Sequence, residues 1–284
     1  PTDRRYHAQA IACPECGPTV RYERERTAVA DGEEAIRRAG ERLAAGDILA
    51  ARGIGGTHLV CDATDPAVVE RLRERTHRPA KPFALMAESV DQVRSFATLS
   101  DDEEAALTDI RRPIVLLESR EAVWLDAVAP GLHTVGVMLP YAGLHHLLFD
   151  HVDGPLVMTS ANMPGEPMVT TVAGIYDRMG SVVDGALVHD RDIVARCDDS
   201  VVRVVDGDRR FLRRSRGWTP AALPNPVGET PPVLALGPER DATVAVADED
   251  RVVLSQHVGD VDSPQTLGFL RDATDHLTGL TGID

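Results

Sequence analysis

The side chains with the clearest potential for chemistry are cationic and lie between Arg73 and Pro82. This segment reads RERTHRPAKP, and its Lys81 is the single lysine in a chain with 29 arginines. Lysine is a compact, strongly hydrated point charge and arginine is a planar fork, so a phosphate site can require one of them specifically. Prolines on both sides fix the backbone around the charges. We therefore consider Lys81 a candidate phosphate ligand, against the alternative of a solvated basic loop.

Three other segments have side chains or glycines suited to an anion. They are Arg52–Gly56 (RGIGG), Met158–Asn162 (MTSAN) and Leu212–Gly217 (LRRSRG). Taken singly, they are also typical of a glycine turn, an asparagine turn and a charged edge strand. An acidic chain must concentrate positive charge locally to hold a polyphosphate, and screening over about 10 Å hides its distant acids. Together the four segments predict a polyphosphate site.

Composition limits the class of protein. The 284 residues carry a net charge of −15, which argues against a general nucleic-acid coat. They are 43% hydrophobic, enough for a sizeable core, and the apolar runs are too short and interrupted to cross a membrane. We find no secretory signal pattern and expect a cytoplasmic protein.

Cys13 and Cys16 form a CPECGP sequence, the pattern of a zinc knuckle in which a turn directs two thiolates at one metal. A redox pair and two free thiols are the alternatives. A structural zinc site needs four ligands, and the chain opens at Pro1 without an initiator methionine. We therefore expect half of a zinc site whose other half lies upstream. Cys61 and Cys197 are isolated and are expected to be small buried residues.

Strand and helix patterns alternate, which predicts an α/β domain with a mixed twisted sheet. A capping box from Asp31 to Glu34 is expected to open a helix with Ile36, Ala39 and Leu43 on one face. Proline-rich residues 220–232 predict a linker, followed by a hairpin and a helix over 264–280. The expected organisation is residues 1–28 as a partial zinc finger, 29–219 as the α/β domain, 220–232 as the linker and 233–284 as the start of another domain.

Common hydrolase signatures are missing. The chain has no nucleophile elbow with a Ser-His-Asp order and no HExxH helix. His145 and His146 are neighbours on a predicted helix, so they should point to different sides. The pair Asp198 and Asp199 could bind Mg²⁺, although a loop pair of this kind is usually solvated.

Five blocks in this order resemble the YrdC-like domain of the HypF family of hydrogenase maturation carbamoyltransferases. They are GIGGTHLVCDAT (53–64), RERTHRPAKPFALM (73–86), VMLPYAGLHHLL (137–148), PLVMTSANMPGEP (155–167) and VHDRDIVARCDDSVVRVV (188–205). The CPECGP knuckle is similar to the family's last zinc-finger half. Residues 234–260 resemble the start of its Kae-type, actin-like ATPase domain. The resemblance thus covers nearly the whole chain.

This resemblance implies an incomplete HypF-type carbamoyltransferase. It would form carbamoyl-adenylate from ATP and carbamate derived from carbamoyl phosphate, with Mg²⁺, for transfer to the C-terminal cysteine of HypE in cyanide-ligand synthesis. Lys81, Arg78 and Ser160 would be catalytic, and Cys13 and Cys16 would bind structural Zn²⁺. Nucleotide contacts are expected from five further side chains, Arg52, Arg75, Asn162, Ser200 and Arg213.

The sequence departs from the family at Thr76, where a lysine is common, so one phosphate contact is expected to be missing or moved. The GPERD turn at 237–241 also differs from the usual pattern. Two alternatives remain within the same fold. One is threonylcarbamoyl-adenylate synthesis for tRNA modification, against which the knuckle and the segment after the linker argue. The other is an RNA-binding module without catalysis, against which the net charge of −15 argues.

Overall fold

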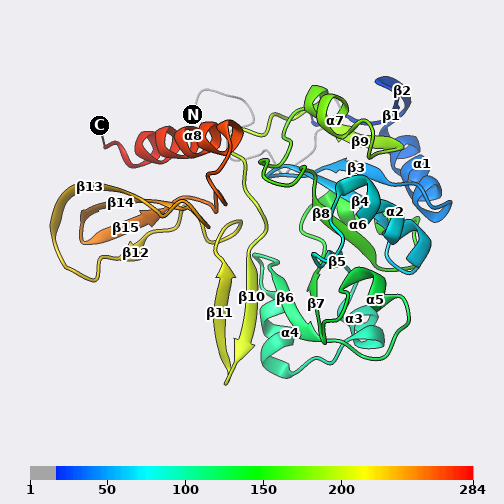
Figure 1. Cartoon of the computed structure of the whole chain (residues 1–284), viewed down its shortest axis with the longest axis horizontal. Coiled ribbons are helices and arrows are strands. Elements are labelled where there is room, and N and C mark those ends of the chain that lie inside the picture. The colour runs from blue at the N-terminus through cyan, green and yellow to red at the C-terminus, as the bar shows by residue number, and fades with distance from the viewer. Residues whose placement is uncertain (1–16, 284) are drawn as a thin grey trace.

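A mixed sheet of eleven strands forms the centre of the protein in a computed structural model that describes residues 17–283 (Figure 1). Its strands, in spatial order, are β11 (Asp208–Arg213), β10 (Val201–Val205), β6 (Ile114–Glu118), β7 (Thr134–Met138), β5 (Ala84–Met86), β8 (Leu156–Ser160), β4 (Thr57–Asp62), β3 (Leu49–Arg52), β9 (Gly185–His189), β1 (Val20–Arg24) and β2 (Thr27–Asp31). Three neighbouring pairs, β10 with β6, β5 with β7 and β3 with β9, are parallel, and the others are antiparallel. The predicted α/β class with a mixed sheet is confirmed.

Helices cover both faces of this sheet. One core contains apolar side chains from α2 (Pro66–Thr76), α3 (Val90–Phe96), α4 (Asp101–Thr108), α5 (Leu125–Val128) and α7 (Val172–Met179). The other contains side chains from α1 (Gly32–Ala44) and α6 (Gly143–Phe149). In β4, Leu59 and Cys61 belong to the first core and Val60 to the second, because successive side chains of a strand point to opposite faces. The central strands are therefore apolar on both sides.

The beginning of the sheet differs from the sequence prediction. The sequence predicts a partial zinc finger over residues 1–28, but residues 20–31 contain β1 and β2, and β1 pairs with both β2 and β9. The predicted domain boundary at 28–29 therefore falls inside β2. Asp31 is the N-cap of α1 but its side chain makes no capping hydrogen bond, and Glu34 instead pairs with Arg37 and Arg38. The expected capping box is wrong because two arginines on the next turn compete for that carboxylate. The apolar face of α1 is buried as predicted.

A second, smaller sheet follows, beside the large domain (Figure 1). It contains β12 (Leu223–Pro224), β15 (Arg251–Leu254), β14 (Val244–Glu249) and β13 (Thr230–Leu236), and packs on α8 (Pro264–Thr281). The predicted hairpin and the predicted helix after it are confirmed as β13–β14 and α8. Part of the expected linker is ordered, since β12 pairs with β15. Over residues 17–283, no helix combines the length and apolar character needed to span a bilayer.

Candidate functional site

Two adjoining cavities, of about 220 and 280 Å³, share one wall between β8, β11 and the loop after α2. Residues that line both are Arg78, Lys81, Ser160, Asp198 and Arg213. They come from segments up to 135 positions apart in the sequence, between Arg78 and Arg213. The structure thus brings the predicted cationic and small polar side chains together.

The loop that carries the two cations starts where α2 ends. His77 adopts a left-handed conformation (φ 52°) that terminates the helix and turns the chain. Arg78 is then buried, and its guanidinium donates to Thr159 Oγ1 (3.2 Å) and to Asn162 Oδ1 (2.8 Å). These bonds fix the guanidinium against the end of β8.

The polar end of β8 is ordered by the same asparagine. Ser160 Oγ donates to Asn162 Oδ1 (2.9 Å), and Asn162 Nδ2 donates to the carbonyl oxygens of Met163 (3.2 Å) and Glu166 (2.9 Å). Asn162 lines the first cavity, and Ser160 lines both. Small polar groups at a strand end can contact a ligand without blocking it, which fits their position here.

Lys81 is one of the cations available to a ligand. Its side chain is exposed and makes no ion pair or hydrogen bond with the residues the structure describes. Although Lys81 is exposed, desolvation by the surrounding protein lowers its pKa, and the positive charges of Arg78 and Arg213 lower it further. An anion bound between the three cations would relieve this repulsion.

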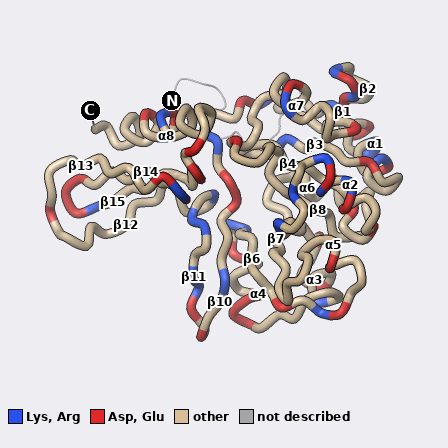
Figure 2. Tube along the Cα trace, in the orientation of Figure 1, with Lys and Arg blue, Asp and Glu red and all other residues tan. Residues whose placement is uncertain are grey.

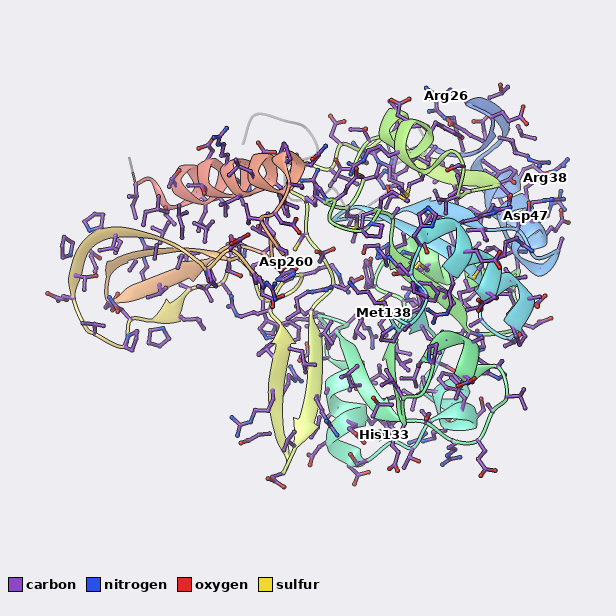
Figure 3. The ribbon with its side chains drawn as sticks, viewed as in Figure 1. Arg26, Arg38, Asp47, His133, Met138 and Asp260 are labelled. Carbon is purple, nitrogen blue, oxygen red and sulfur yellow. The ribbon has the colours of Figure 1, made fainter. Side chains whose placement is uncertain are left out.

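The first cavity is closed by the C-terminal part of the chain. Asp241, His257 and Asp260 line it opposite Lys81 and Arg213. Figure 3 labels Asp260 where this part faces hairpin β10–β11. Burial lowers the pKa of His257, and the positive charge of Arg213 lowers it further. These three residues are not recognisable from the sequence, because nothing in their spacing indicates that they face a distant loop.

The second cavity has an apolar wall. Phe83, Leu116, Leu132 and Met158 line it together with Gly136. A Cβ atom at Gly136 would lie 2.9 Å from Ile114 Cγ2, so only glycine fits beside the strand there. An apolar wall next to a cationic one suits a ligand with a flat ring and a charged tail.

A buried ion-pair network supports the far side of this second cavity. Asp199 Oδ2 lies 3.0 Å from His58 Nε2, and Arg216 Nε donates to Asp199 Oδ1 (2.7 Å). Burial alone would raise the pKa of Asp199, but His58 and Arg216 hold it below the usual range. His58 pairs in register with Ser160 across β4 and β8. Through the contact between Asp199 and His58, the network connects the segment that contains Asp198 to the strand that contains Ser160. The sequence suggested a solvated Asp pair, and for Asp199 that is wrong.

Three residues predicted to contact the nucleotide line neither cavity. Arg52 is buried and donates to the carbonyl oxygens of Thr170 and His189. Arg75 pairs with Asp184 (3.0 Å) on the other side of α2. Ser200 is fully buried, accepting from Ser215 N (2.8 Å) and donating to Arg216 O (2.9 Å). The structure gives all three side chains partners within the protein, which neither composition nor spacing reveals.

The departure from the family pattern at residue 76 also has a structural counterpart. Thr76 is fully buried, and its hydroxyl donates to Leu72 O (2.7 Å) within α2. It therefore offers no group to the cavities. Cys13 and Cys16 lie outside the described residues, and within 17–283 no group of three or more His, Cys, Asp or Glu side chains could hold a metal ion. Cys61 is buried as predicted, and Cys197 is partly buried.

Charged side chains of both signs line the two cavities. Figure 2 shows acidic and basic residues interspersed over the helices, with several arginines along hairpin β10–β11. Arg213 is the last residue of β11 in this hairpin, and it lies on the wall shared by the two cavities. The shared wall therefore carries three cations and the carboxylate of Asp198, and the first cavity adds the carboxylates of Glu166, Asp241 and Asp260.

The fold and the sequence together define the class of protein. The Sua5, YciO and YrdC family model, described as "Telomere recombination", matches residues 41–215. This match exceeds half of the chain, so the chain belongs to that family. Models described as "HypF finger" and "HypF Kae1-like domain" match residues 1–22 and 228–284.

Relatives of known name place the similarity more narrowly, in HypF. The chain is 45% identical over 97% of its length to carbamoyltransferase HypF of Rhodobacter capsulatus, and 42% identical over 90% to probable carbamoyltransferase HypF of Methanocaldococcus jannaschii. It covers 37% and 33% of those relatives, so it spans about a third of their length. The resemblance predicted from sequence is confirmed.

Solved structures agree with this placement. A phosphate- and nucleotide-bound full-length HypF superposes on the whole chain with a TM-score of 0.92 at 35% identity, covering 37% of that structure. HypF of T. kodakarensis gives 0.92 at 45% identity, covering 97% of this chain and 36% of that one. P. abyssi Sua5 complexed with L-threonine gives 0.59 at 22% identity over 66% of this chain and 55% of that one, which shows a shared fold.

Proposed function

We propose that the paired cavities bind ATP and adenylate carbamate, as part of a HypF-type carbamoyltransferase. The observation that carries this proposal is the convergence of Arg78, Lys81, Ser160 and Arg213 on one wall. An apolar pocket on one side suits adenine, and the cations suit the phosphates. The nucleotide bound to the similar HypF structure supports this choice of ligand.

The reaction would need no side-chain nucleophile. A carbamate oxygen attacks the α-phosphorus of ATP, the bond from that phosphorus to the bridging oxygen breaks, and pyrophosphate leaves with the electron pair. Negative charge grows on the departing pyrophosphate, where Lys81 and Arg213 would neutralise it. Ser160 and Asn162 would orient the small substrate, and Arg78 would hold their strand end in place through Asn162.

A magnesium ion fits the donors present. Mg²⁺ prefers oxygen ligands and is commonly held by one or two carboxylates together with substrate phosphates. Asp198 is the carboxylate shared by both cavities, and it would be the protein ligand. When bound, Mg²⁺ would neutralise part of the phosphate charge.

The remaining parts of the function concern the larger protein. Curated relatives are named carbamoyltransferases, which supports carbamoyl phosphate as the source of carbamate. We propose the C-terminal cysteine of HypE as the acceptor, with transfer depending on parts of HypF beyond this chain. The match of residues 1–22 to the HypF finger supports Cys13 and Cys16 as zinc ligands.

The test is exchange of labelled pyrophosphate into ATP in the presence of carbamate. We expect wild-type chain to catalyse this exchange and Lys81→Ala to lower its rate about 100-fold, because a charge-stabilising donor is lost. Arg75→Ala is the matched control, since it removes another cation from the same helix and loop region but one that faces Asp184. Its exchange rate should stay within about twofold of wild type.

Two results would contradict the proposal. Wild-type chain that neither binds ATP nor exchanges pyrophosphate has no adenylation site. Equal exchange by wild type and Lys81→Ala would show that the shared wall is not where the phosphates bind.

A further inference from the structure

Arg73 makes an unusual set of contacts beneath the loop that carries the two cations. It is only 2% exposed, and its guanidinium donates to four backbone carbonyl oxygens. Two belong to the end of α5, Ala127 O (2.8 Å) and Val128 O (2.8 Å), and two to the loop, Arg78 O (2.9 Å) and Lys81 O (2.9 Å). One side chain thus joins three segments of the chain.

Other contacts hold the two ends of the same loop. The Arg73 guanidinium carbon lies 4.4 Å from the centroid of the Phe83 ring, and Phe83 N donates to Val128 O (3.0 Å). Arg78 N donates to Arg73 O (3.0 Å) at the other end of the loop. Residues 78–83 are therefore held at both ends and in the middle, with Arg73 at the centre.

Burying this guanidinium is costly, because it forms no ion pair with the residues described by the structure. Removing an arginine from water without a carboxylate partner is tolerated only where its donors are satisfied. A planar fork can donate to carbonyls on two sides at once, which the tetrahedral ammonium of lysine cannot reproduce. Because lysine could not satisfy the same carbonyl groups, we expect this buried position to require arginine.

The loop needs such support for two reasons. Pro79 and Pro82 remove backbone donors that could otherwise hold it. Arg78 and Lys81 carry like charges, and Lys81 has no partner of its own among the described residues. A loop that relaxed would move these cations apart.

We propose that Arg73 is a positioning residue that fixes the spacing of Arg78 and Lys81 for phosphate, by holding the carbonyl groups of both. This inference rests on the proposed adenylation. Arg73 itself lines neither cavity and would touch no substrate.

The experiment compares Arg73→Lys with Arg71→Lys in the full 284-residue chain. Arg71 lies on the same helix and donates to Gly46 O, away from the cavities, so its variant loses a similar contact elsewhere. Arg73→Lys should speed hydrogen exchange in peptides covering residues 77–84 at least about tenfold. It should also lower kcat/KM for pyrophosphate exchange about 10- to 100-fold, since small misplacement of a catalytic group has effects of that size. Arg71→Lys should change neither.

A double-mutant cycle separates positioning from general stability. If Arg73 acts through Lys81, then adding Arg73→Lys to Lys81→Ala should lower exchange by much less than it does in wild type. Additive effects, or unchanged hydrogen exchange at 77–84, would overturn the inference. So would unfolding of both Arg73→Lys and Arg73→Gln under conditions where Arg71→Lys stays folded, because Arg73 would then stabilise the whole domain.

Failure of the proposed function is distinguishable from failure of this inference. Absence of ATP binding and pyrophosphate exchange in wild type would end the adenylation proposal, and with it the phosphate part of the inference. Wild-type exchange matched by Arg73→Lys would end the inference alone.

Discussion

Among single residues, Asp199 is under a clear electrostatic constraint, because its buried carboxylate is shared between His58 and Arg216. The same Arg216 lies over the Tyr141 ring, 3.6 Å from its centroid. Removing the carboxylate charge would leave the guanidinium buried without its counterion. The contribution of this ion pair to the free energy of unfolding therefore depends on having both Asp199 and Arg216 present.

We predict that Asp199→Asn lowers the free energy of unfolding by about 3–5 kcal/mol, the usual cost of breaking a buried pair from one side. Urea denaturation measures this. Asp208→Asn is the control, because Asp208 pairs with Arg210 on the surface, with 69% of its side chain exposed, and should change stability by less than about 1 kcal/mol. Equal effects of the two substitutions would mean that the buried network contributes nothing special.

His145 should make stability depend on pH. Burial lowers the pKa of His145 from 6.5 to about 3, with a further contribution from His58. Between these values the unfolded chain binds a proton that the folded chain does not, so stability falls as pH is lowered. From pH 7 to pH 5, wild type should lose about 2 kcal/mol more than His145→Phe, which keeps a ring against Tyr141. Urea titrations at both pH values check this, and parallel losses would contradict it.

At the scale of elements, the end of α2 is the feature that directs the cationic loop. His77 ends that helix in the left-handed region that glycine prefers, so its backbone is strained there. His77→Gly should raise the free energy of unfolding by about 0.5 kcal/mol. Ala45→Gly, at a helix end with φ −82°, should instead lower it by about 0.5–1 kcal/mol. Differential scanning calorimetry tests the opposite signs, and a loss at both positions would be inconsistent with relief of strain.

The elements that sequence predicted well are the ones whose pattern is local. Buried strands such as β8 and amphipathic helices such as α1 follow from apolar runs and periodicity. The strands β1 and β2 were missed because three of the five side chains of β1 are charged and β2 is the edge strand; long-range pairing of β1 with β9, and of β2 with β1, makes them part of the sheet. The capping box at Asp31 failed because a competing salt bridge is decided by side-chain geometry.

The candidate site likewise contains some residues that the sequence identifies and others that only tertiary contacts reveal. Lys81 was identifiable as the single lysine, and Ser160 and Asn162 by the small polar side chains of the MTSAN segment. Charge alone could not separate Arg78, which reaches the cavities, from Arg75, which faces Asp184. Arg73 and His257 needed tertiary contacts to be recognised, because one acts through carbonyl oxygens and the other comes from the distant C-terminal part.

On the scale of the whole molecule, the two parts meet at the first cavity. Ser263 Oγ donates to Gly165 O (3.0 Å), and the Arg196 guanidinium carbon lies 4.5 Å from the Phe269 ring centroid. The cores of the two parts are separate, yet both parts line the same space. We therefore expect the C-terminal part to shape what the large domain binds.

The central claim is that the two cavities form one nucleotide site, and a crystal structure with a non-hydrolysable ATP analogue tests it most directly. We predict the phosphates within hydrogen-bonding distance of Lys81 and Arg213, and the adenine against Phe83 and Met158. An analogue bound elsewhere, with Lys81 still free, would contradict the account.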